Sequence, residues 1–202
     1  MKKHLKIIKT LMMKRYMIKL LIRVMVFVIV LVGYLFDRER LIEFMIQPIT
    51  MGVTPLHLLW MMFMVMMLLH IFPTDKLTMA LRKSEKKTYE KIPEHSKEEL
   101  YDFVRNQNIR AWIVMLVWLV FNAIFGLLYV QDIINEADLF MLTVFYFLSD
   151  YICILFFCPF QTFIMKNKCC VNCRIYDWGH FIMFTSMLFI KNFFCWSLFF
   201  TS

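Results

Sequence analysis

Five apolar stretches, each long enough to cross a lipid bilayer, restrict the fold of this chain more than any other feature of its sequence. A transmembrane helix needs about 20 mostly apolar residues to cross roughly 30 Å of hydrocarbon. Hydrophobic residues make up 61% of the 202-residue chain, and a soluble domain of this size would be covered with apolar surface. We therefore predict a single transmembrane domain over residues 1–202, folded as an all-α polytopic helix bundle. Its five predicted spans are residues 17–36, 53–72, 111–130, 139–157 and 181–200.

The positively charged residues predict how these spans are oriented. Residues 1–23 carry eight Lys and Arg, residues 73–110 carry nine and residues 158–180 carry three, whereas residues 37–52 carry two. Basic residues gather on the cytoplasmic side of membrane proteins, so we expect a cell-membrane protein with a cytoplasmic N-terminus and cytoplasmic loops 73–110 and 158–180. The same rule explains the net charge of +8 without a nucleic-acid partner. The fifth stretch runs almost to the last residue, as it would in a chain truncated from six spans.

Polar residues within and between the apolar stretches predict local structure. Ser96 followed by Glu99 has the spacing of a capping box and predicts a helix that leads into the third span. Asn122, inside that span, is expected to hydrogen-bond a neighbouring helix. Residues 41–50 are apolar but interrupted by Pro48, which predicts a short interfacial or re-entrant segment before the second span.

Cysteine residues gather in the predicted loop 158–180. Two of them, Cys170 and Cys173, have the two-residue spacing that lets both thiolates reach one metal ion. The loop is expected to face a reducing compartment, where disulfides are disfavoured and soft thiolates suit zinc or an iron–sulfur cluster. The candidate ligands are Cys158, Cys169, Cys170, Cys173 and His180. Two alternatives stay open: a redox-active thiol pair, and cysteines that are unliganded or lipidated.

The order of these motifs resembles two kinds of membrane protein. The segment from Cys158-Pro159-Phe160 through Cys169-Cys170-Val171-Asn172-Cys173 to His180 resembles uncharacterised bacterial multi-pass proteins with a CPF…CCxxC loop. That resemblance covers residues 158–180 and implies a membrane location. The Cys-Pro pair followed by a CxxC also faintly resembles membrane-bound ferredoxin-type accessory proteins, which implies electron transfer.

Charged residues inside the predicted spans form a second candidate site. Asp150 and Lys191 lie in the fourth and fifth spans, about 12 Å and 16 Å above the inner boundary at 1.5 Å per residue. An isolated charge at such a depth costs about 2.5–3.5 kcal/mol, and pairing relieves that cost. We therefore expect Asp150 and Lys191 to contact each other, either as a structural ion pair or as part of an ion path. Lys19 and Arg23 are expected to extend toward the cytoplasmic boundary.

The sequence carries no phosphate-binding loop, zinc-protease motif or nucleophile elbow. The leading functional prediction is therefore a non-enzymatic membrane protein whose cytoplasmic cysteine loop binds zinc or another soft metal. The alternatives are a redox or electron-transfer membrane protein that uses the same cysteines, and a small transporter component built around Asp150 and Lys191. The expected partners are the lipid bilayer and either further copies of the chain or other membrane subunits.

Overall fold

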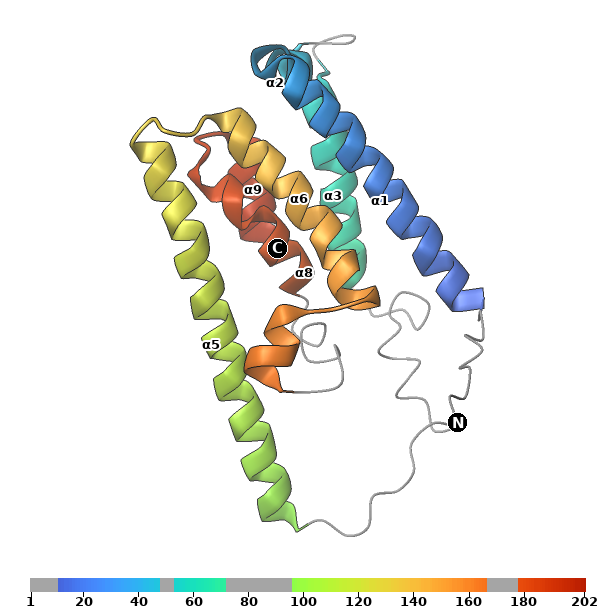
Figure 1. Cartoon of the computed structure of the whole chain (residues 1–202), viewed down its shortest axis with the longest axis vertical. Coiled ribbons are helices and arrows are strands. Elements are labelled where there is room, and N and C mark those ends of the chain that lie inside the picture. Colours follow the sequence, from blue (N-terminus) through green and yellow to red (C-terminus); the bar gives the residue numbers. More distant parts are fainter. Residues whose placement is uncertain (1–10, 48–52, 72–95, 167–177) are drawn as a thin grey trace, which may run out of the picture.

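The computed structural model describes residues 11–47, 53–71, 96–166 and 178–202 (Figure 1). The regular elements in these ranges are helices, so the predicted all-α class is confirmed there. In chain order they are α1 (Leu11–Phe36), α2 (Arg38–Ile46), α3 (Pro55–Ile71), α5 (Lys97–Val130), α6 (Glu136–Leu155), the π-helical turn η1 (Phe160–Met165), α8 (Trp178–Phe184), the 3₁₀ helix η2 (Thr185–Phe189) and α9 (Phe193–Thr201).

The long helices stand side by side and alternate in direction along the chain. In Figure 1, α1 packs along α6 with α3 behind them, and α5 stands on the other side of α6 from α1. The elements α8, η2 and α9 fill the space between α5, α6 and α3. The buried core lies where α3, α6, α8, η2 and α9 meet. Its most enclosed apolar side chains are Leu139, Phe184 and Leu198, each at most 1% exposed.

The structure supports two helices of spanning length, not the five that the sequence predicts. Among the described residues, only Tyr16–Phe36 of α1 and all 34 residues of α5 are long and apolar enough to cross a membrane. Helix α3 is 17 residues long. Helix α6 is 20 residues long but carries three acidic residues, Glu136, Asp138 and Asp150, which interrupt its apolar character.

The fifth predicted span is not one straight helix. The chain rises through α8 and η2, bends at Ile190–Asn192, and returns as α9 (Figure 1). The two arms pack against each other, with the rings of Phe181 and Phe199 5.6 Å apart and the Trp196 indole donating to the Leu188 carbonyl over 3.1 Å. The side chain of Asn192 accepts from the Phe194 amide and caps α9. An average of hydropathy along 181–200 does not detect this bend, because one Lys-Asn pair changes the average little.

The helix start that the sequence predicts at Ser96 is confirmed, and residues 41–46 of the predicted interfacial or re-entrant segment 41–50 are helical, with 48–50 outside the described residues. The Ser96 hydroxyl accepts from the Glu99 amide over 3.2 Å and starts α5. At 1.5 Å per residue, this 34-residue helix is about 51 Å long, so its first turns would extend beyond a bilayer core of roughly 30 Å. Helix α2 packs across the end of α1 and is started by Asp37, whose carboxylate accepts from the Glu39 and Arg40 amides.

A glycine lets α5 pack closely against the C-terminal hairpin of α8, η2 and α9. A Cβ placed on Gly126 would overlap the ring of Phe189. Because glycine has no Cβ, the Phe189 ring can pack directly on the backbone of α5. The Phe189–Gly126 contact therefore holds the bend of the hairpin beside α5, about one helical turn before α5 ends at Val130.

Candidate functional site

One polar cluster joins α1 to the second half of α6. The guanidinium of Arg23 lies 3.1 Å from the carboxylate of Asp150 and also donates to the Phe147 carbonyl. Its charge lies 4.0 Å from the ring centre of Phe147 and 3.9 Å from that of Tyr151. Because Phe147, Asp150 and Tyr151 are spaced i, i+3 and i+4, they share one face of the helix. That face provides a carboxylate, a carbonyl and two aromatic rings for a single arginine.

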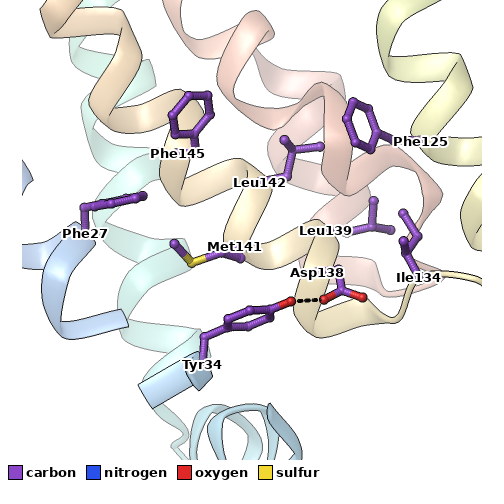
Figure 2. A pocket seen from close by; sticks show the side chains of 9 residues that line it. All are labelled: Phe27, Tyr34, Phe125, Ile134, Asp138, Leu139, Met141, Leu142 and Phe145. Carbon is purple, nitrogen blue, oxygen red and sulfur yellow. Dashed lines mark hydrogen bonds between the residues drawn. The ribbon is translucent and has the colours of Figure 1, made fainter. Parts of the chain in front are cut away.

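A second polar cluster joins the other end of α1 to the start of α6. The hydroxyl of Tyr34 donates to the carboxylate of Asp138, as the dashed line in Figure 2 marks. Arg38, the first residue of α2, lies 3.4 Å from the same carboxylate and 4.7 Å from the centre of the Tyr34 ring. Asp138 also accepts from the Asn135 amide over 2.8 Å and so helps to cap α6. One carboxylate thus links three helices.

An open groove runs from this second cluster over the first half of α6, between α1 and α5. It encloses about 300 Å³, and its walls are apolar apart from the Tyr34–Asp138 end (Figure 2). The lining residues are Phe27, Tyr34, Phe125, Ile134, Asp138, Leu139, Met141, Leu142 and Phe145.

Buried polar side chains form a seam between α5, α6 and η2. Asn122, which is 1% exposed, accepts from the Tyr146 hydroxyl over 3.1 Å and donates to the Trp118 carbonyl over 3.0 Å. The predicted interhelical bond of Asn122 is therefore confirmed. The Trp118 indole donates to Thr185 over 3.2 Å.

A shorter arm of the same seam joins α6 directly to η2. The hydroxyl groups of Thr143 and Ser186 lie 2.6 Å apart, and Thr143 also donates to the Leu139 carbonyl over 3.0 Å. Ser186 is fully buried and Thr143 is 5% exposed. Both hydroxyls therefore find partners inside the protein, so neither is buried without a hydrogen bond.

The structure pairs Asp150 with Arg23 in place of the predicted Lys191. Lys191 lies in the exposed bend between η2 and α9. This bend follows η2, whose Ser186 contacts Thr143 in the first half of α6. The start of α8, in contrast, lies beside Asp150, where a Cβ on Gly179 would be 3.7 Å from the carboxylate. Asp150 is therefore beside the start of α8, and Lys191 follows the end of η2. Among the described residues, no ion pair joins these two side chains. The clue in the sequence was Arg23 itself, an arginine well inside the first apolar stretch.

The predicted metal site falls largely outside the described residues, because Cys169, Cys170 and Cys173 are in the range 167–177. Cys158 is buried just after α6, and His180 is half-buried in α8. Within the described parts of the chain, no three His, Cys, Asp or Glu side chains are grouped so as to hold a metal ion. The zinc or iron–sulfur site therefore stays a prediction.

Over the residues that the structure describes, the fold is all-helical, and two of its helices are long and apolar enough to cross a membrane. Comparison of the chain with protein-family models, with curated proteins and with solved structures finds no match. The chemistry of the clusters therefore carries the functional argument. They contain fixed ion pairs between helices, a buried hydrogen-bonded seam and one apolar groove with a charged end.

Proposed function

We propose that this chain is a non-enzymatic, multi-pass integral membrane protein whose N-terminus is cytoplasmic. The observation that carries the proposal is the exposure of apolar side chains on α1 and α5. None of the most apolar part of α1 is buried within the protein, and 22% of the corresponding part of α5 is buried. The core helix of a soluble protein would be largely covered, so these two helices need an apolar surrounding.

The size of the exposed side chains supports a lipid surrounding. Three large residues on each helix are 60–67% exposed, and exposing apolar area to water costs about 25 cal/mol per Å². Hydrocarbon chains remove that cost. These residues are Ile18, Leu21 and Ile29 on α1, and Trp112, Leu116 and Leu127 on α5.

The placement of charge supports the same surrounding. Arg23 is seven residues inside Tyr16–Phe36, about 10 Å along the helix axis. Its guanidinium is directed at Asp150 and two aromatic rings of α6, which is how charged side chains at membrane depth are accommodated. The charged group of Arg23 is thus turned inward, while large apolar side chains of α1 are turned outward.

The Arg23–Asp150 pair supports a structural role in preference to an ion path. A guanidinium keeps its charge throughout the physiological pH range, and this one is engaged by a carboxylate, a carbonyl and two rings. A carboxylate that carries a proton or ion must exchange partners during each cycle. We therefore assign the pair to holding α1 against α6.

Extraction and topology mapping test this proposal. Carbonate or urea washing should leave the protein in the membrane fraction, and only detergent should release it. In the proposed topology, α3 and α6 cross the bilayer together with α1 and α5. Alkaline phosphatase fused after Gln47 or Ile134 should then be active outside the cell, whereas fluorescent protein fused after Ile71 or Lys166 should be fluorescent inside. Release by carbonate, or the reverse pattern of fusion activity, would contradict the proposal.

A further inference from the structure

We propose that the groove over α6 binds one acyl chain of an aminophospholipid, with the lipid's phosphate at Arg38 and its ammonium group at Asp138. This inference rests on the proposed membrane location. The groove has apolar walls and a polar end. Its walls are apolar side chains of α1, α5 and α6, while Tyr34 and Asp138 form its polar end (Figure 2). Arg38 lies just outside the lining, 3.4 Å from the Asp138 carboxylate.

The apolar part of the groove matches a hydrocarbon chain in shape and chemistry. From Asp138 to Phe145 it follows α6 for seven residues, about 10 Å at 1.5 Å per residue. Its volume of about 300 Å³ is at the lower end of ligand pockets, which fits part of one chain and not a bulky ring system. Phe27, Met141 and Leu142 supply its side walls, as Figure 2 shows.

The charged end selects the headgroup. Arg38 has a half-exposed side chain, 56% by area, and its one ion pair among the described residues is the 3.4 Å contact with Asp138. A guanidinium has five N–H donors, so it can hold a phosphate through two of them and keep its contact with Asp138.

The carboxylate beside Arg38 gives the site its preference among phospholipids. Asp138 accepts from Tyr34 and from the Asn135 amide, and an ionised carboxylate has about four acceptor positions. A primary ammonium group can donate to the remaining positions, whereas a quaternary ammonium cannot. The phosphate of an anionic headgroup without an amine could still meet Arg38, but it would bring no cationic donor to this carboxylate. The pair of opposite charges therefore matches a headgroup that carries a phosphate and a primary amine.

The position of the charged end agrees with the lipid's geometry in a membrane. Tyr34 lies two residues before the end of α1, and Arg38 begins α2 directly after it. The cluster is thus at the boundary of the apolar helix, where headgroups lie, and the groove runs from there toward the middle of α6. The acyl chain of a bound lipid would enter the groove from the same leaflet as its headgroup.

A lipid-competition experiment tests this inference. Full-length protein, purified in detergent and stripped of lipid, is incubated with equal amounts of phosphatidylethanolamine, phosphatidylcholine and phosphatidylglycerol of identical chains. Retained lipid is counted by mass spectrometry after gel filtration. We expect about tenfold enrichment of phosphatidylethanolamine, because all three phosphates can meet Arg38 but only this lipid has a primary ammonium group that can make charge-assisted hydrogen bonds to Asp138.

Two variants test the contact with the lipid headgroup and the contact with the acyl chain separately. Leu142→Trp fills the groove and should abolish retention, while Arg38→Gln removes the phosphate contact from an exposed position and should reduce retention about tenfold. The matched control Arg40→Gln, on the same helix but paired with Asp37, should leave retention unchanged. Equal retention of the three lipids by the native chain would overturn the inference, as would undiminished retention by Leu142→Trp. A protein that stays soluble without detergent would instead contradict the proposed membrane location.

Discussion

The carboxylate of Asp150 lies 3.1 Å from the guanidinium of Arg23, across 127 residues of chain. This contact joins α1 to α6 and fixes the position of α1 along the axis of α6. It also satisfies two charges at a depth where each alone would be costly. The stability of the α1–α6 pair should therefore depend on both residues together.

Removal of either charge should destabilise the protein by about 2 kcal/mol, since the surviving charge is left without its partner. The side chains of Arg23 and Asp150 are 19% and 28% exposed, which keeps the loss below that of a fully buried pair. The double variant Arg23→Met with Asp150→Asn should lose less than the sum of the single variants. Thermal unfolding of detergent-purified protein measures the coupling. Lys191→Met is the control, and coupling of Asp150 to Lys191 instead of Arg23 would refute the assignment.

Gly126→Ala should be destabilising by about 1–3 kcal/mol, because the new methyl group would overlap the Phe189 ring. Phe189→Leu combined with Gly126→Ala should recover part of the loss by making room. Gly33→Ala is the matched control, since its Cβ would meet only the movable end of Leu41 at 3.2 Å. Chemical or thermal unfolding distinguishes the two glycines, and equal effects would show that Phe189 does not pack on α5 as described.

Asn122→Leu should cost about 1–2 kcal/mol, because the Tyr146 hydroxyl and the Trp118 carbonyl lose their partner in the buried seam. Tyr146→Phe should have a smaller effect, since it removes the hydroxyl donor and leaves only the side-chain oxygen of Asn122 without that partner. The exposed Tyr101 provides a control, Tyr101→Phe, expected to be neutral. Additive losses for Asn122→Leu and Tyr146→Phe would indicate that the two side chains do not interact.

A cysteine at position 191 should react with a membrane-impermeant maleimide added outside the cell. The reason is that Lys191 lies in the exposed bend between η2 and α9, close to the end of α5. Leu198→Cys, at a site 1% exposed, should stay unlabelled. A straight fifth helix would instead bury residue 191 in the membrane, and protection of both cysteines would support that arrangement.

Metal analysis of purified protein tests the cysteine loop. We expect about one zinc per chain in a colourless sample, or brown absorbance if the ligands hold an iron–sulfur cluster. Cys170→Ser with Cys173→Ser should abolish metal binding. Cys195→Ala, a buried cysteine of α9, should leave the metal content unchanged. A native chain without metal would discard both the zinc and the cluster predictions.

Several local features could be predicted because their causes are local. The capping box at Ser96 needs only residues within one helical turn, and Asn122 needs a partner simply because it is a polar group in an apolar helix. The short helix α2 starts at Asp37, whose carboxylate accepts from two amides of its own first turn. The all-helical class follows from the apolar stretches, since a backbone in hydrocarbon must satisfy its own hydrogen bonds.

The sequence by itself thus determined the helical class, the start of α5 and the apolar character of α1 and α5. Only the tertiary structure decided which cation meets Asp150, because that choice depends on the relative heights of helices far apart in the chain. It also decided that residues 181–200 fold back on themselves. The arm before that bend contacts α6 and α5 through the Thr143–Ser186 and Trp118–Thr185 hydrogen bonds, and Gly126 leaves room for the Phe189 ring. Hydropathy describes each segment alone, whereas these contacts exist only between segments.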